Sequence, residues 1–361
     1  MKVLIVDDSV VFRSQIKAAL SGSPLIEVVG VASDGKIAIE KMKAEPVDLI
    51  TLDLEMPRMN GLETIREMKK LKLPTRVIVF ASRTKTGTEM ALDALKEGAD
   101  DFIAKPANVQ SIEDAQQKIS QDLVPKILQF ANSDSTTAHI PNASAGVLPA
   151  NLSFKKIHIE SIIPRVILIG CSTGGPTALE TLFAGLKGPL PCPILIVQHM
   201  PPGFTTTLAR RIEAISKIPC EEAKQWAKLS ENKIYIAPGD YHMRLHQKAD
   251  DIFLKLDQGP QRHNVRPAVD NLFESATPIY GDKVVAFVLT GMGEDGLQGV
   301  REIKRAGGGV MIQDKASCVV FGMPGAIFND GCFDKIGNLQ EIQTAMAKLL
   351  QTPVRLIENV S

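Results

Sequence analysis

The first twenty residues, MKVLIVDDSVVFRSQIKAAL (Met1–Leu20), contain the pattern that decides the fold of the N-terminal region. The run Lys2–Val6 is apolar after its first residue and is followed at once by two acids, as expected where a buried parallel strand ends. Beyond the acids, apolar residues recur at helical spacing and predict a helix that packs on this strand. These residues are Val11, Phe12, Ile16, Ala19 and Leu20.

The same alternation of strand and helix recurs along the first part of the chain. A later helix-like segment, for example, places Leu62, Ile65 and Met68 on one face together with Leu71. Five βα units predict an α/β fold with a doubly wound parallel sheet and right-handed crossovers, in the flavodoxin-like (βα)5 arrangement. The predicted strands are Lys2–Val6, Glu27–Val31, Leu49–Leu52, Arg76–Phe80 and Asp101–Ile103.

A second α/β region begins at Arg165, after a stretch with the composition of a linker. Residues 131–153 (ANSDSTTAHIPNASAGVLPANLS) are rich in Ser, Thr, Asn, Ala and Pro and lack periodicity. The later runs VILIG, ILIVQ, KIYIA and VVAFVLT each lead into a turn with Gly or Pro, which predicts a second doubly wound, Rossmann-like parallel sheet. We therefore predict a first domain over 1–121, a linker over 122–162 and a second domain over 163–352.

Composition and charge exclude several classes of protein. Hydrophobic residues make up 44% and charged residues 23% of 361 residues, which is enough apolar material for two globular cores. Lys+Arg and Asp+Glu both number 41, so the bulk charge gives no reason to expect nucleic acid as a partner. No run reaches the roughly 18 apolar residues of a membrane span, and the N-terminus does not read as a signal peptide. Five cysteines without a CxxC pair fit reduced thiols in a cytoplasm.

Five polar residues follow the predicted strands of the first domain, at positions that meet on one edge of an open α/β sheet. Asp7, Asp8 and Asp53 would repel one another, and a hard divalent cation such as Mg²⁺ would relieve the repulsion. Asp53 is then the candidate nucleophile toward a phosphoryl group, whose oxygens Ser82 and Lys105 could bind. Acids after strands also cap helices or solvate a rim, but the five positions together favour a phosphoryl site.

The second domain carries a candidate nucleophile in the turn GCSTGGP (Gly170–Pro176). Ser172 lies between a predicted strand and a predicted helix, whose free N–H groups favour an oxyanion, as at a nucleophile elbow. Two other interpretations are open. A phosphate-binding turn is disfavoured because GxGxxG is absent and no GKS or GKT follows. Ser172 could also be an ordinary helix N-cap.

A serine nucleophile needs a base, usually a histidine oriented by a carboxylate. His199 directly follows ILIVQ and therefore comes to the same sheet edge as Ser172. Asp295, in the Gly-rich turn after VVAFVLT, is the candidate carboxylate; Glu294 is the neighbouring alternative, and Asp295 could also be an N-cap. The chain order Ser, His, Asp differs from the order Ser, Asp/Glu, His of α/β-hydrolases. It therefore predicts a catalytic triad on a doubly wound sheet that is not an α/β-hydrolase fold.

The other histidines are weaker candidates for the base. His139 and His158 lie in or beside the predicted linker, and His242 and His246 alternate along a predicted strand as core or rim residues. His263 lies in a polar loop and is a candidate for binding substrate.

Taken together, the motifs resemble one known family. DLEMPRMNG (Asp53–Gly61) resembles the response-regulator receiver that precedes a methylesterase domain, over residues 1–121. Residues 163–350 resemble the protein-glutamate methylesterase catalytic domain. The matching segments are GCSTGGP, QHMPPGFT, YIAPGDYHM, RPAVDNLFES, LTGMGEDG and FGMPGA.

The resemblance implies roles for particular residues of the second domain. The family's nucleophile falls on Ser172, its base on His199 and its acid on Asp295. Thr173 and the backbone N–H of Met292 match positions that bind substrate or stabilise the oxyanion.

Two further positions concern the receiver and the nucleophile turn. Phe102, three residues before Lys105, matches the family's switch aromatic. Cys171 stands where the family often has a smaller residue, while Ser172 keeps the motif position of the nucleophile.

The resemblance also implies a function and partners. It predicts a phosphorylation-activated hydrolase that demethylates glutamate γ-methyl esters and deamidates glutamines on methyl-accepting chemotaxis receptors, with a chemotaxis histidine kinase as phosphodonor. We expect a cytoplasmic monomer that needs Mg²⁺ in the receiver and no cofactor for the hydrolase chemistry, with no nucleic acid bound and no membrane insertion. A receptor-binding adaptor without activity and a receiver-linked hydrolase of another ester stay open. A transcription factor is disfavoured because no Lys/Arg-rich C-terminal helix is visible.

Overall fold

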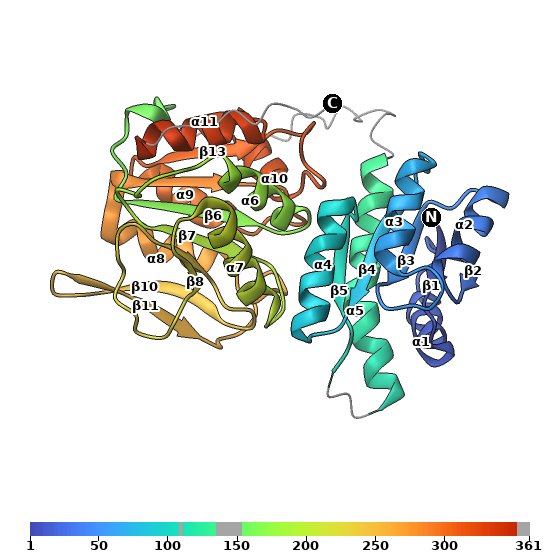
Figure 1. The fold of residues 1–361 in the computed structure, drawn as a ribbon. Helices are drawn as coiled ribbons and strands as arrows, with labels where there is room; N and C mark the ends of the chain where they lie inside the picture. The colour runs from blue at the N-terminus through green and yellow to red at the C-terminus, as the bar shows by residue number, and fades with distance from the viewer. Residues whose placement is uncertain (108–110, 135–153, 352–361) are drawn as a thin grey trace. The chain divides into compact units, whose positions relative to one another are not determined.

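The computed structural model describes residues 1–107, 111–134 and 154–351, and the chain divides into two compact units, Met1–Gly146 and Val147–Ser361. Each unit contains a parallel sheet with helices on both faces (Figure 1). The predicted α/β class with two doubly wound sheets is therefore confirmed. Residues 135–153 of the predicted linker lie outside the described residues.

The first unit has a five-stranded parallel sheet in the order β2-β1-β3-β4-β5, which is the flavodoxin-like order. Helices α1 and α5 lie together on one face, and α2, α3 and α4 lie on the other. The strands are β1 (Lys2–Val6), β2 (Glu27–Ala32), β3 (Leu49–Asp53), β4 (Arg76–Ala81) and β5 (Asp101–Ala104). The helices are α1 (Val10–Leu20), α2 (Gly35–Ala44), α3 (Gly61–Lys70), α4 (Lys85–Glu97) and α5 (Ile112–Asp134).

Helix α5 continues past residue 122, where we predicted the linker to begin, as far as Asp134. Its residues Leu123, Ile127 and Phe130 are buried at helical spacing, and this apolar face accounts for the extension. Pro125 lies inside the helix and does not end it.

The second unit has a seven-stranded parallel sheet in the order β14-β13-β12-β6-β7-β9-β8, and a separate antiparallel hairpin of β10 and β11. Its strands are β6 (Val166–Cys171), β7 (Ile194–Gln198), β8 (Cys220–Glu222), β9 (Ile234–Ile236), β10 (His242–Lys248), β11 (Asp251–Asp257), β12 (Val284–Val288), β13 (Gly309–Gln313) and β14 (Lys335–Gly337). Its helices are α6 (Gly175–Ala184), α7 (Phe204–Ser216), α8 (Val269–Tyr280), α9 (Leu297–Arg305), α10 (Met323–Asp330) and α11 (Leu339–Leu350).

The four runs that predicted strands correspond to β6, β7, β9 and β12. Helices α6, α7 and α11 pack together on one face of the sheet, and α8, α9 and α10 pack on the other. Strands β6, β7 and β12 are buried along their whole length because helices cover both faces.

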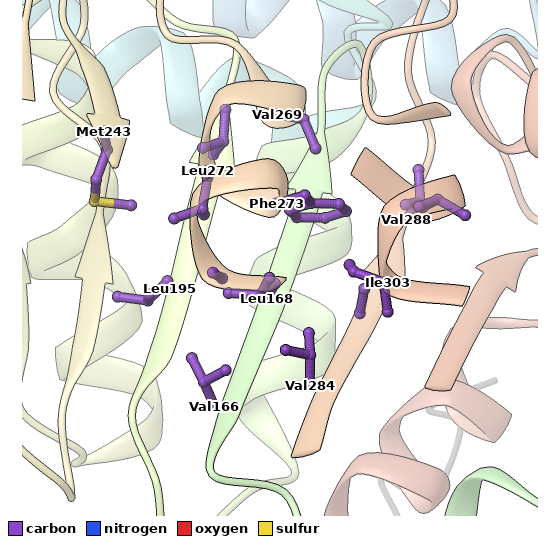
Figure 2. Close-up of a cluster of buried hydrophobic side chains, with 14 of the residues drawn as sticks. Val166, Leu168, Leu195, Met243, Val269, Leu272, Phe273, Val284, Val288 and Ile303 are labelled. Atoms are coloured by element: carbon purple, nitrogen blue, oxygen red, sulfur yellow. The ribbon is translucent and has the colours of Figure 1, made fainter. Parts of the chain in front are cut away.

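A hydrophobic core lies between the sheet and α8. Figure 2 shows Leu272 and Phe273 of α8 gathered with Leu168 and Leu195 of the sheet, and all four side chains are fully buried. Full burial of side chains of this size stabilises the fold by about 1.5–3 kcal/mol each. The same packing fixes the N-terminal end of α8 near the carboxyl ends of the strands.

A buried ion pair anchors the start of the second unit. Lys304 Nζ lies 2.5 Å from Asp334 Oδ1, and both side chains are almost inaccessible. The same carboxylate accepts N–H bonds from Ile157 and Val310, each at 2.8 Å. These bonds attach the segment that follows residue 153 to the sheet. Separately, none of the helices in the described ranges is both long enough and apolar enough to cross a bilayer.

Candidate functional site

The strand order of the second unit brings three catalytic candidates together. β12, β6 and β7 are neighbours, and Ser172, His199 and Asp295 each follow one of them. Cys171 is opposite Gln198 in the register of β6 and β7, so Ser172 and His199 come next on adjacent strands. The chain adds β7 on one side of β6 and later β12 on the other, which makes this edge a topological switch point, the usual place for a ligand.

The turn that carries Ser172 is shaped by glycine. Gly174 has a φ of 77° and is the N-cap of α6, so Ser172 is not that helix's cap. A Cβ on Gly174 would lie 2.6 Å from Val319, so a side chain is excluded by space as well as by conformation. The Gly175 N–H donates to Ser172 O at 2.8 Å and closes the turn directly before α6.

The loop after β12 packs directly against this turn. The Ser172 N–H donates to Thr290 O at 3.0 Å, and a Cβ on Gly291 would lie only 2.8 Å from Ser172 Cβ. The next residue, Met292, has a backbone N–H without a hydrogen bond within the described part of the chain. Thr173 is buried beside Ser172, and the Thr290 hydroxyl donates to its carbonyl at 2.9 Å. An open N–H next to the candidate nucleophile is what an oxyanion donor requires.

His199 and Asp295 are in direct polar contact. His199 Nε2 lies 2.8 Å from Asp295 Oδ2, and the carboxylate also accepts the Val269 and Asp270 N–H groups at 2.6 and 3.0 Å. Burial alone would raise the pKa of Asp295, but the contact with His199 and the two N–H donors together hold it below its usual range. An ionised Asp295 only accepts, so Nε2 carries the proton and Nδ1 is left to act as the base.

The described residues contain no hydrogen bond between Ser172 and His199; the two are brought together by the strand register alone. Catalytic hydrogen bonds are often long or absent without substrate, so this separation does not exclude the pair. The alternative acid, Glu294, is exposed and its carbonyl accepts the Leu297 N–H, whereas Asp295 contacts the histidine.

The remaining histidines have other surroundings. His242 is buried, accepts the Ala268 N–H at Nδ1 and donates from Nε2 to Pro260 O, so both ring nitrogens are engaged in the fold. His246 packs edge-on against Trp226. His263 contacts Asp270. His158 pairs with Glu160, and His139 lies outside the described residues.

Cys171 is a poor competitor for the role of nucleophile. Its side chain is completely buried, and burial raises the pKa of its thiol far above the usual range. A thiol that stays protonated and inaccessible does not attack an ester.

Gln198 is a residue of the site that the sequence did not single out. Its side chain is 1% exposed, and Nε2 donates to Ser172 O at 2.9 Å and to His199 O at 3.3 Å. Its Oε1 has no partner among the described residues. The amide therefore joins the backbone of the proposed nucleophile to that of the proposed base. The sequence contained one signal for this residue: Gln198 is the polar last residue of the otherwise apolar run ILIVQ.

We expect Gln198→Met to lower kcat for ester hydrolysis by about tenfold with little change in KM, because small misplacements of reacting groups are costly. The measurement is steady-state hydrolysis per folded molecule. Gln343→Met is a matched control, since Gln343 Nε2 also donates to two buried carbonyls, Thr181 and Leu182, at the other end of α6. Equal loss of kcat in both variants would show a general packing effect.

The first unit assembles the predicted phosphoryl site. Ligand atoms of Asp7, Asp8 and Asp53 all lie within 4.8 Å of one another. Lys105 Nζ lies 2.9 Å from Asp53 Oδ1 and 3.3 Å from Asp7 Oδ2. Asp53, Ser82 and Lys105 line one small hollow at the carboxyl ends of the strands.

The acidic residues suit a divalent cation. Burial, and then the charge of Asp53, raise the pKa of Asp7 to about 6, because a buried and crowded carboxylate resists a further negative charge. Asp7, Asp8 and Asp53 supply carboxylate oxygens, the ligands that Mg²⁺ prefers. Receiver domains in general use Mg²⁺ for phosphorylation, and these residues fit that ion.

The proposed switch residues are connected to different parts of the receiver. The Ser82 hydroxyl lies 2.9 Å from the Thr84 hydroxyl, and Thr84 caps α4 by accepting the Gly87 N–H. A change at Ser82 can therefore reach the start of α4. Phe102 is buried in β5.

Both units of this chain are similar to known proteins. The response regulator receiver domain family matches residues 3–117, and the CheB methylesterase family matches residues 167–346. A relative from Trichodesmium erythraeum, named protein-glutamate methylesterase/protein-glutamine glutaminase, is 42% identical over 94% of this chain and 96% of its own length. A relative of the same name from Thermotoga maritima is 38% identical over 97% of this chain and 98% of its own.

The methylesterase catalytic domain of Thermotoga maritima CheB provides a solved structure. It is 40% identical, with a TM-score of 0.50, and the match covers 52% of this chain and 98% of that domain. A receiver joined to a hydrolase domain defines a response regulator with enzymatic output. This chain belongs to the protein-glutamate methylesterase/protein-glutamine glutaminase family.

Proposed function

We propose that this chain hydrolyses glutamate γ-methyl esters and deamidates glutamines on methyl-accepting chemotaxis receptors, activated by phosphorylation at Asp53. Its family is one of carboxylic-ester hydrolases of chemotaxis and two-component signalling. The observation that carries the proposal is the convergence of Ser172, His199 and Asp295 at three neighbouring strand ends, with the His199–Asp295 contact at 2.8 Å. We propose residues 1–121 as the receiver and 163–352 as the catalytic domain.

Acyl transfer would begin with attack by Ser172 Oγ on the ester carbonyl carbon, while its proton passes to His199 Nδ1. Asp295 holds the imidazole in the required tautomer and stabilises its positive charge. The Met292 N–H and the N-terminal end of α6 stabilise the oxyanion, with Thr173 beside it. The tetrahedral intermediate then expels the alkoxide, which takes the proton from His199 and leaves as methanol.

Water completes the cycle. It attacks the acyl-Ser172 carbonyl and gives its proton to His199, and collapse of the second intermediate returns that proton to the serine oxygen. The products are the original Ser172 and a glutamic acid side chain, which releases its proton to solvent and becomes a carboxylate. For a glutamine side chain, ammonia replaces methanol as the leaving group, and the other steps are the same.

In the receiver, the Asp53 carboxylate would attack the phosphorus of a phosphohistidine, forming a P–O bond as the P–N bond breaks and the histidine leaves; we propose that the donor is a chemotaxis histidine kinase. Asp7, Asp8 and Asp53 would hold Mg²⁺, which supplies positive charge for the phosphoryl oxygens. Lys105 and the Ser82 hydroxyl bind those oxygens after transfer. Ser82 and Phe102 would then pass the change to the rest of the receiver.

The test is methanol release from methylated receptor membranes, measured with and without a phosphodonor. We expect release in both cases and a higher rate with the phosphodonor. A receptor-binding adaptor would release no methanol, and a hydrolase of another ester would cleave small esters but leave receptor methyl groups in place. Either result would overturn the proposal.

A shortened chain tests the direction of control. All the proposed hydrolase residues lie in the second unit, so we expect a chain that begins at residue 151 to be active and insensitive to a phosphodonor. If the receiver restrains the hydrolase, this chain is about tenfold faster than the unphosphorylated full chain, a difference of only about 1.4 kcal/mol. A rate no higher than that of the unphosphorylated full chain would mean that the receiver stimulates rather than restrains.

A further inference from the structure

Two buried aspartates lie close together in the second unit, and the mechanism above uses only one of them. The side chain of Asp270 is 0% exposed and that of Asp295 is 2% exposed. Burial, and also the charge of Asp295, raise the pKa of Asp270 above its usual range. A buried acid with no part in the chemistry needs another explanation.

The two aspartates cap each other's helices. Asp295, which precedes α9, accepts the Val269 and Asp270 N–H groups that begin α8. Asp270, in the first turn of α8, accepts the Gly299 N–H in the first turn of α9 at 2.8 Å. Neither helix receives a cap from the side chain of its own N-cap residue. The unpaired N–H groups that every helix start presents are thus satisfied by a crossed pair of carboxylates.

The crossed caps leave the two helices little freedom to shift. A Cβ on Gly299 would lie 2.3 Å from Phe273 Cβ, so α8 and α9 touch closely just beyond the caps. Phe273 is itself buried in the core beneath α8 (Figure 2). The position of Asp295 is therefore set by where Asp270 holds the start of α9.

The side chains of His263 and Arg262 face the two aspartates. His263 Nε2 lies 3.0 Å from Asp270 Oδ2 and 4.0 Å from Asp295 Oδ1, so an imidazolium there would face both carboxylates. Arg262 Nη2 lies 3.2 Å from Asp270 Oδ2. The same guanidinium makes two 2.7 Å bonds to Glu274, one turn further along α8.

A tight turn presents these two side chains. Arg262 and Val265 exchange both backbone hydrogen bonds, at 3.1 and 3.0 Å. Between them, His263 and Asn264 have φ values of 53° and 60°, the backbone of a two-residue type I′ turn. This geometry aims His263 at Asp270 instead of leaving it on a loose loop.

We propose that Asp270 is a positioning residue for the hydrolase reaction. By capping α9, with His263 and Arg262 as its side-chain partners, it holds Asp295 where that carboxylate receives the His199 N–H. This inference rests on the proposed roles of His199 and Asp295 and adds to them a residue that does not touch the substrate.

The test measures kcat and KM for methanol release from methylated receptor membranes by the full chain. We expect Asp270→Ala to lower kcat by about 10–100-fold and to leave KM within about threefold, because the acid is misplaced while the substrate surface is unchanged. Asp270→Asn keeps an acceptor for the Gly299 N–H and should restore kcat to within about fivefold of the wild type. Asn338→Ala, which removes the side-chain cap of α11 in the same unit, is the control and should leave kcat unchanged.

The inference is overturned if Asp270→Ala keeps kcat within about twofold of the wild type, or if the loss lies in KM. If Asp270→Ala does not fold, His263→Asn is measured in its place. Asparagine tolerates the left-handed backbone conformation of this partly exposed turn, so this variant should fold. For His263→Asn we expect kcat to fall by roughly three- to tenfold while KM is unchanged. A raised KM alone would assign His263 to substrate binding and contradict the positioning role.

Asp295→Ala separates this inference from the proposed function. If Asp295→Ala hydrolyses receptor esters at the wild-type rate, the proposed triad itself is wrong. If Asp295→Ala is inactive while folded Asp270→Ala is as fast as the wild type, the triad stands and only the positioning role of Asp270 fails.

Discussion

Ser172→Ala is expected to lower methanol release from methylated receptors by at least about 10³-fold, because loss of the nucleophile of a triad leaves only the catalysis due to binding and the oxyanion site. The Ser172 side chain makes no hydrogen bond within the described residues, so the substitution removes little that stabilises the fold. We expect the free energy of unfolding to change by no more than about 0.5 kcal/mol. The measurement combines hydrolysis rates with thermal unfolding of the same preparation.

Cys171→Ala is the control for this prediction. Cys171 is adjacent to Ser172 but is buried and lacks a reactive thiolate, so Cys171→Ala should keep most of the activity and should still react with a fluorophosphonate probe. Ser172→Ala should not react. Near-normal turnover by a folded Ser172→Ala protein, or transfer of the label to another residue in the wild type, would show that the nucleophile lies elsewhere.

Asp53→Asn is expected to reduce phosphoryl labelling of the chain to background, at least about 100-fold below the wild type, because an amide is not a nucleophilic carboxylate. The label should be an acyl phosphate that hydroxylamine removes. Chelation of divalent cations should have the same effect on the wild type, since Asp7, Asp8 and Asp53 form a crowded acidic cluster before any phosphoryl charge is added. Stimulation of methanol release by a phosphodonor should disappear together with the label.

Asp34→Asn is a matched control in the same unit. Asp34 is buried and caps α2 by accepting the Lys36 and Ile37 N–H groups, a role that asparagine also performs. This variant should therefore fold and be labelled like the wild type. Wild-type labelling of Asp53→Asn would identify another acceptor, and labelling that survives chelation would argue against a metal at the acidic edge.

Much of the fold could be predicted from the sequence because strands that are buried on both faces appear as continuous apolar runs. Every predicted strand of the first unit is present, as are the four runs predicted in the second. Several of the predicted site residues follow from one rule, that polar residues after parallel strands share an edge, whereas Thr173, Met292 and Phe102 came from the family resemblance. That rule applies to Asp7 and Asp53 in one sheet and to Ser172 and His199 in the other.

Other features depended on contacts that local patterns do not describe. The linker was predicted to begin at residue 122, yet α5 continues to Asp134 because Ile127 and Phe130 find a buried face that exists only in the folded sheet. Composition near Pro125 contains no information about that face.

The sequence by itself determined the class of fold, the order of the chemical groups along the chain and their placement at the ends of strands. Only the tertiary structure decided that β12 and β7 flank β6, that Asp295 rather than Glu294 meets His199, and that Gln198 and Asp270 support them. The physical reason is sequence separation. The His199–Asp295 contact joins residues 96 positions apart, and the Asp270–Gly299 contact joins residues 29 apart, so both depend on strand order and helix packing instead of local periodicity.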